Sequence, residues 1–267
     1  MIIIKTKEEI ELMRQGGKIL AEVLNEVAKK VQPGITTAEL NKIAEDLILR
    51  KGAAPAFKGY RGFPFALCIS VNEEVVHGAP SARELKNGDI VGLDLGIVYP
   101  PELCFSCPFS SGSCGGTPGL FTDSAITVAV GKIDARAEKL IKVTKRALEI
   151  GLEQIRPNAY LGDLGFAIQS YVELEGFSII RDLVGHGVGK ELHEEPEIPN
   201  FGKAKTGPKL KEGMTLAIEP MVAMGKYHII KGKRDDFAYE TADKSLTAHF
   251  EHTVVVTKDG CEVLTKL

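Results

Sequence analysis

The chain has 267 residues, of which 44% are hydrophobic and 26% are charged, as in an ordinary globular protein with a large core. The formal net charge of −3 gives no general basic surface, so we expect no specific nucleic-acid partner. No apolar run approaches the roughly 18 residues of a membrane span or the core of a signal peptide, and five cysteines, an odd number, suit a reducing compartment, so we expect a cytoplasmic protein with no membrane contact.

The first part of the chain predicts two helices. The first covers 6–31, where Thr6 and Glu9 form a capping box and apolar residues recur at helical spacing. The second begins with a similar capping box at Thr36 and stops near Gly52.

The same order of helix, turn and helix returns later, with helices predicted over 135–155 and 161–175. Each pair precedes strand-rich sequence, so we interpret the chain as one domain, 1–267, built from two related α+β halves, about 1–130 and 131–267. The identity between the two helix pairs is weak, and a coincidence between amphipathic helices is the alternative.

Four acidic residues interrupt apolar strands. Asp94 lies in the middle of IVGLDLGIV, and an ionised carboxylate in such a place needs a positive partner. Asp123, Glu219 and Glu251 interrupt three further strands; a single acid near a strand end is usually exposed, but four such acids call for one or two divalent cations. The predicted strands are 65–77, 90–98, 121–130, 214–223 and 248–257.

Histidines add to this set. His186 lies between glycines in GHGVG, which excludes a helical zinc motif and leaves room for a close approach to a metal, although a buried structural histidine is the alternative. His193 follows seven residues later, and His77 ends a strand-like stretch.

At this point the sequence closely resembles the type I methionine aminopeptidases over nearly its whole length. Six motifs in order carry the resemblance: CISVNEEVVHGAP (68–80), GLDLGIV (92–98), FTDSAITVAVG (121–131), GHGVGKELHEEP (185–196), GMTLAIEPMV (213–222) and SLTAHFEHTVVVT (245–257).

The resemblance implies an α+β "pita-bread" fold, with two pseudo-symmetric αβ halves around a curved antiparallel sheet. It implies a metalloprotease that removes the initiator methionine from nascent proteins by the attack of metal-activated water. The cofactors would be two divalent ions (Co, Mn, Fe or Zn), and some relatives also hold a monovalent cation at places matching Asn72 and Ser245. The implied metal ligands are Asp94, Asp123, His186, Glu219 and Glu251.

The resemblance also implies roles in catalysis and substrate binding. Glu219 would move a proton between water and the leaving amine, and His77 and His193 would contact the substrate near the cleaved bond. Phe237 stands where relatives often have Trp, and core packing is the alternative for each apolar residue taken singly. The implied methionine pocket is lined by Phe57, Tyr60, Phe63, Cys68, Leu192 and Phe237.

The sequence departs from this family between its two aspartates, where about 99–119 form an insertion rich in Gly, Pro and Ser. It contains Cys104, Cys107 and Cys114. We favour free thiols in an irregular loop; a disulfide and a small zinc site are the alternatives.

Two other functions remain as alternatives. One is another pita-bread peptidase, such as an X-Pro aminopeptidase or prolidase, although these usually carry a large extra N-terminal domain that we do not expect here. The other is a binding protein of the same fold that has lost its ligands, which the intact ligand set disfavours. The resemblance further implies a monomer that meets nascent-chain N-termini, with a transient encounter with ribosomes.

Overall fold

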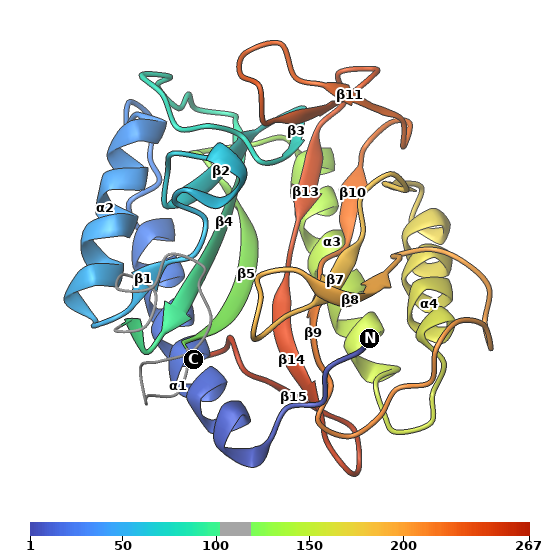
Figure 1. Ribbon diagram of the computed structural model, residues 1–267. Coiled ribbons are helices and arrows are strands. Elements are labelled where there is room, and N and C mark those ends of the chain that lie inside the picture. The colour runs from blue at the N-terminus through green and yellow to red at the C-terminus, as the bar shows by residue number, and fades with distance from the viewer. Residues whose placement is uncertain (102–118) are drawn as a thin grey trace.

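The computed structural model describes residues 1–101 and 119–267. In the first half, α1 (Lys7–Ala28) and α2 (Thr37–Arg50) pack against each other beside the strands, where Figure 1 shows them in blue. Both predicted capping boxes are present, since the hydroxyls of Thr6 and Thr36 each accept the N–H of a glutamate three residues on. α1 ends before the predicted residue 31 because its last turn tightens into shorter-range hydrogen bonds, such as Lys30 N–H to Val27 O at 2.9 Å.

The second half repeats this plan. α3 (Ala135–Glu153) and α4 (Leu161–Leu174) pack together and agree with the predicted helices to within two residues. α3 begins at Asp134, whose carboxylate accepts two backbone N–H groups of the first turn. α3 lies behind the strands that Figure 1 shows in orange, with α4 beside it.

The strands of the first half bring two acidic residues to one face. β4 pairs antiparallel with β2 and β5, with Asp94 opposite both Cys68 and Ala125, and with Gly96 opposite Asp123. Since side chains alternate along a strand, Cys68, Asp94 and Asp123 all point to the same side. The elements are β1 (Ala54–Pro55), the 3-10 helix η1 (Tyr60–Gly62), β2 (Leu67–Val71), β3 (Glu74–Val76), β4 (Ile90–Tyr99) and β5 (Leu120–Ala129).

The strands of the second half are shorter and also antiparallel. The longest path of pairing runs β15–β14–β9–β7–β8, which sets His186 opposite Ala217, two residues before Glu219. The elements are β6 (Ser178–Ile179), β7 (Gly185–Gly187), β8 (Glu194–Ile198), β9 (Thr215–Ile218), β10 (Met221–Ala223), β11 (Ile229–Lys231), β12 (Tyr239–Thr241), β13 (Thr247–His249), β14 (His252–Val256) and β15 (Cys261–Val263).

A seam of hydrogen bonds joins β5 to β13 and β14, and so joins the two halves. At its centre Glu251 N–H donates to Ala125 O at 2.8 Å. On one side the hydroxyl of Thr253 accepts the N–H of Asp123 and donates to its carbonyl, and on the other side Thr127 does the same for His249. The two threonine contacts lie two residues to either side of the Ala125–Glu251 pair and exchange strands, as a two-fold relation between the halves requires.

Two of the predicted strands break at their acidic residues. The run 214–223 divides at Glu219 and Pro220, because proline has no N–H for the ladder, and the run 248–257 divides at Phe250 and Glu251. The run 65–77 also divides, at Asn72, whose φ of 61° turns the chain between β2 and β3. Predicting these runs as continuous was wrong.

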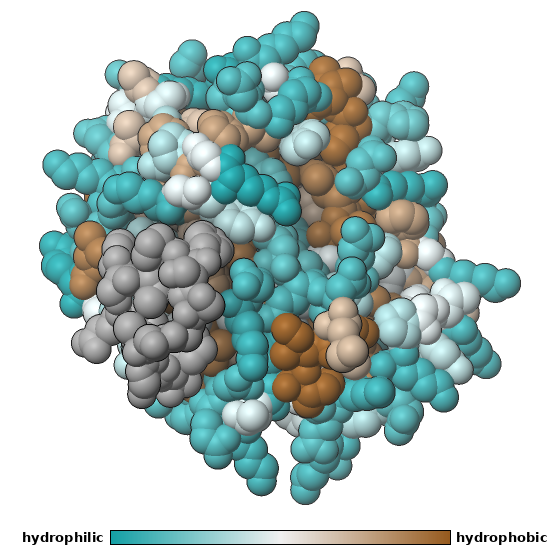
Figure 2. All heavy atoms as spheres, viewed as in Figure 1, coloured by the Kyte–Doolittle hydropathy of each residue, from teal (hydrophilic) through white to brown (hydrophobic). Residues whose placement is uncertain are grey.

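Most of the predicted insertion at 99–119, including Cys104, Cys107 and Cys114, lies outside the described residues. No helix within residues 1–101 and 119–267 is both long and apolar enough to cross a membrane. On the face seen in Figure 2, hydrophilic residues prevail and hydrophobic ones gather in separate patches.

Candidate metal centre and substrate cavity

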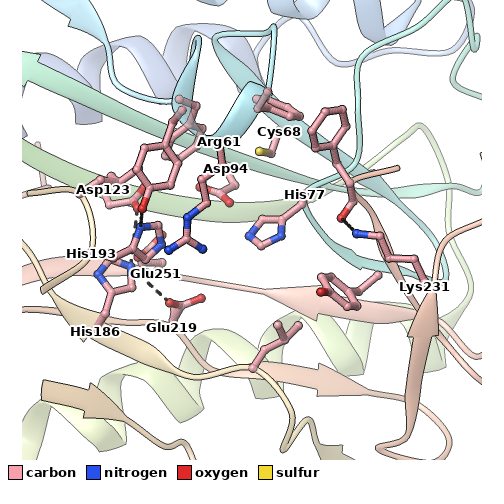
Figure 3. A pocket seen from close by; sticks show the side chains of 17 residues that line it. Arg61, Cys68, His77, Asp94, Asp123, His186, His193, Glu219, Lys231 and Glu251 are labelled. Atoms are coloured by element: carbon pink, nitrogen blue, oxygen red, sulfur yellow. Dashed lines mark hydrogen bonds and ion pairs between the residues drawn. The ribbon is translucent and has the colours of Figure 1, made fainter. Parts of the chain in front are cut away.

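One cavity, of about 370 Å³, lies between the two halves and is drawn in Figure 3. Every residue that the sequence predicted for the divalent ions, for catalysis or for the methionine pocket lines it, whereas Asn72 and Ser245, predicted for a monovalent cation, do not. The predicted residues that line it are Phe57, Tyr60, Phe63, Cys68, His77, Asp94, Asp123, His186, Leu192, His193, Glu219, Phe237 and Glu251.

Three of these side chains form a compact group on the cavity wall. One ligand atom each from Asp123, His186 and Glu251 lies within 4.8 Å of the others, and all three residues are buried. Nε2 of His186 also lies 3.7 Å from Oε1 of Glu219. A carbonyl oxygen can only accept, so the 2.8 Å contact between Nδ1 of His186 and Gly187 O puts the proton of the neutral ring on Nδ1. The lone pair of Nε2 therefore faces the carboxylates, as a metal ligand requires.

The carboxylates in this group have no compensating cation among the described residues. Oδ1 of Asp94, Oδ1 of Asp123 and Oε1 of Glu251 are buried without a hydrogen-bond partner. Burial raises the pKa of Asp94 to about 7, with the nearby Glu219 acting in the same direction. Burial, and then the neighbouring carboxylates, also raise the pKa of Asp123 and Glu251 well above their usual values.

This donor set fits divalent ions. Oxygen ligands with one imidazole suit first-row divalent metals, and a bound ion would satisfy the orphaned oxygens and offset the burial and repulsion that raise the pKa values. Asp94 and Asp123 come from the first half, and His186, Glu219 and Glu251 from the second, so the group closes only when the halves meet.

Two further histidines face the open cavity beside this group. Nδ1 of His193 lies 2.9 Å from the hydroxyl of Tyr60, and its ring is 4.2 Å from that of His186, centroid to centroid. Loss of hydration between the cavity walls, followed by the adjacent His186, lowers the pKa of His193 to about 3. The same loss of hydration lowers the pKa of His77. Both imidazoles are therefore neutral at physiological pH and can each donate one N–H.

One end of the cavity is apolar. The rings of Phe63 and Phe237 meet edge to face at 5.1 Å, and the thiol of Cys68 is buried beside them with its pKa raised by burial. The side chains that form this apolar end are Phe57, Phe63, Cys68, Leu192 and Phe237. A thioether packs well against aromatic rings and a soft sulfur, so this end suits a methionine side chain.

Sequence reasoning missed some residues of the site. Arg61, Leu183, Lys231 and Tyr239 also line the cavity. His249 is buried outside the cavity lining, and its Nε2 lies 3.4 Å from Oε2 of Glu219 but has no hydrogen bond among the described residues. Side chains two residues apart on a strand point to the same side, so the predicted strand 248–257 could have identified His249 from its place two residues before Glu251.

A second missed feature is the buried ion pair of Lys5 and Glu194, whose side chains are 1% and 4% exposed. Glu194 also accepts the N–H groups of Lys190 and Glu191, at 2.6 and 3.1 Å, so it holds together the loop that carries His193. Gly189 leaves room for Lys5: a Cβ there would lie 2.4 Å from Cε of that lysine. The last glycine of GHGVG thus admits a lysine from the N-terminal segment.

Comparison with known proteins agrees with this geometry. Residues 11–104 and 111–258 match the model of metallopeptidase family M24. The methionine aminopeptidase of Clostridium perfringens is 49% identical over 99% of both chains, and methionine aminopeptidase 1 of Bacillus subtilis is 44% identical over 100% of both. The crystal structure of methionine aminopeptidase from Thermotoga maritima, 45% identical, matches over 100% of both chains with a TM-score of 0.91.

This crystal structure and that of methionine aminopeptidase from Rickettsia prowazekii, which matches with a TM-score of 0.90 at 41% identity, confirm the expected α+β pita-bread fold. The prolidase of Pyrococcus furiosus shares the fold alone, with a TM-score of 0.74 at 24% identity over 99% of this chain and 66% of its own.

Proposed function

We propose that this chain, which belongs to the methionine aminopeptidases of metallopeptidase family M24, removes the N-terminal methionine from nascent proteins and peptides by hydrolysis. The observation that carries the proposal is the joining, in one cavity, of a buried carboxylate and imidazole group with an apolar end. The carboxylate and imidazole group sets the chemistry, and the apolar end selects the side chain of the first residue of the substrate.

In this proposal two divalent ions are held by Asp94, Asp123, His186, Glu219 and Glu251. When bound, such ions act as Lewis acids and lower the pKa of a coordinated water toward neutrality. The carbonyl of Gly187 accepts the Nδ1–H of His186 and so leaves Nε2 of that ring unprotonated and free to bind an ion.

The remaining polar groups handle the proton and the developing charge. Glu219 accepts a proton from the attacking water and passes it to the leaving amine. His77 and His193, both neutral, donate N–H groups to the tetrahedral intermediate and to the amide being cleaved. Tyr60 fixes the ring of His193 through its contact with Nδ1.

Several finer features belong to the same proposal. The chain acts as one catalytic domain and as a monomer, with a transient encounter with ribosomes. A monovalent cation binds near Asn72 and Ser245; the buried hydroxyl of Ser245 has no hydrogen-bond partner, which supports a ligand there.

The test is peptide cleavage after removal of metal and the addition of Mn²⁺, Co²⁺, Fe²⁺ or Zn²⁺ in turn. Met-Ala-Ser should lose methionine, whereas N-acetyl-Met-Ala-Ser and peptides of the X-Pro type should not. Glu219→Gln should abolish turnover, and Glu212→Gln, at an exposed residue, should not. Cleavage of X-Pro peptides alone would favour a prolidase, and no turnover with any metal would leave a binding protein.

A further inference from the structure

The cavity carries two cations that the proposed chemistry does not use. Arg61 lies in η1 of the first half and Lys231 at the end of β11 in the second, and both are exposed residues that line the cavity. Figure 3 shows them on either side of His77.

Neutral groups position both cations. The guanidinium carbon of Arg61 lies 5.3 Å from the centre of the Tyr60 ring. The ammonium of Lys231 donates to Phe237 O at 3.1 Å and lies 4.5 Å from the centre of the Tyr239 ring. Among the described residues no carboxylate lies within 4.0 Å of either cation, although other arginines and lysines of the chain form ion pairs. Aromatic faces and a carbonyl hold the positive charge in place without neutralising it.

Both charges act on the cavity. Each contributes, after the loss of hydration, to the lowered pKa of His77, and Arg61 also contributes to that of His193. Two divalent ions would balance the four carboxylates that line the cavity. Arg61 and Lys231 would then supply the remaining charge, which is positive.

The two cations stand where a peptide would leave the site. The methionine side chain fills the apolar end, and the cleaved bond lies beside His77 and His193, so the residues that follow must pass the exposed groups next to these histidines. Arg61 and Lys231 are such groups.

We propose that Arg61 and Lys231 form a subsite for a carboxylate in the part of the substrate that follows the cleaved bond, so that the enzyme favours acidic residues there. The inference rests on the proposed function and names its substrate class. In a full-length nascent chain the carboxylate is an Asp or Glu side chain; in a very short peptide it can also be the C-terminus.

The experiment compares kcat/KM for the C-terminally amidated peptides Met-Ala-Asp, Met-Ala-Ser and Met-Ala-Lys. We expect kcat/KM for the Asp peptide to exceed that for the Lys peptide by about tenfold, with about threefold from each cation. This Asp-to-Lys ratio of kcat/KM should fall as the NaCl concentration rises. Arg61→Gln and Lys231→Gln, in elements from different halves, should each lower the ratio about threefold, and Arg61→Glu should lower it further. Lys142→Glu makes the same change of charge at a side chain that is 78% exposed on α3, outside the cavity, and should leave the ratio unchanged.

The outcomes distinguish a failure of the subsite inference from a failure of the proposed function. Equal kcat/KM for the Asp and Lys peptides, with Met-Ala-Ser cleaved, would overturn the inference and leave the proposed function standing. A ratio unchanged in Arg61→Glu and Lys231→Gln would also overturn it. No cleavage of any peptide would reject both. A preference seen only for free-acid over amidated Met-Ala-Ser would assign the subsite to a C-terminal carboxylate instead of a side chain.

Discussion

Replacing the buried acidic residue Asp94 with a neutral one should stabilise the metal-free protein. Burial raises the pKa of Asp94 from an ordinary 3.8 to about 7, and each pH unit of that rise corresponds to about 1.4 kcal/mol. The ionised Asp94 therefore costs the metal-free fold about 4 kcal/mol once the pH is well above 7. Asp94→Asn, which is nearly isosteric and uncharged, should recover part of this cost, up to about 4 kcal/mol.

The pH dependence of this effect has a definite sign. A carboxyl with a higher pKa in the folded state stabilises the fold below its unfolded pKa, and this stabilisation is lost as the pH rises through the folded pKa. The advantage of Asp94→Asn over wild type should therefore grow with pH, by about 2 kcal/mol between pH 5.5 and pH 8.5.

Urea unfolding of EDTA-treated protein at the two pH values measures this difference. Added metal should narrow the difference, since wild type gains about 2.7 kcal/mol at a metal concentration 100 times the Kd and the variant gains much less. Asp259→Asn, at a side chain that is 82% exposed, is the matched control and should change stability little. If Asp94→Asn destabilises the metal-free protein at pH 8.5 by a kilocalorie or more, the burial of an ionised Asp94 does not carry the cost argued above.

Three other substitutions test the groups around the site. Lys5→Met leaves the buried carboxylate of Glu194 without its cation and should destabilise the protein by about 3 kcal/mol in urea unfolding. Adding Glu194→Gln to this variant should restore most of the lost stability, and no recovery in the double variant would contradict the ion-pair account. Tyr60→Phe removes the contact with His193 and should lower kcat about fivefold with little change in unfolding, and an unchanged kcat would show that the hydroxyl has no positioning role. His249→Leu should weaken metal binding about tenfold in competition with a fluorescent chelator, and an unaltered Kd would argue against any influence of this ring on the ligands.

The helices were predicted correctly from the sequence, and the candidate metal ligands could be proposed from it, because both signals are local or chemical. A capping box such as that of Thr6 and Glu9 specifies a helix start within four residues, and an acid inside an apolar strand such as Asp94 is conspicuous in any context. The resemblance to a known family supplied the remaining proposed roles, and the residues that it implied for the divalent ions, catalysis and the methionine pocket all line the cavity.

What the sequence did not reveal depends on contacts between distant segments. Lys5 looks like an ordinary surface lysine until the N-terminal segment lies across Gly189 and meets Glu194. The strand break at Glu219 was missed because apolar β-propensity on both sides outweighed the proline that follows, although a proline inside a run is itself a signal for a break. The strand break at Glu251 has no comparable local signal.

The seam between β5 and the strands β13 and β14 predicts that the chain can be divided into two fragments that reassemble. A cut in the turn 131–134 would leave all of its hydrogen bonds in place, because they join side chains and backbone groups on opposite sides of the cut. The first fragment would carry both aspartates of the metal group, and the second would carry its histidine and glutamates. Neither piece could then hold ions in the full coordination set, so the uptake of metal on mixing would report their reassembly.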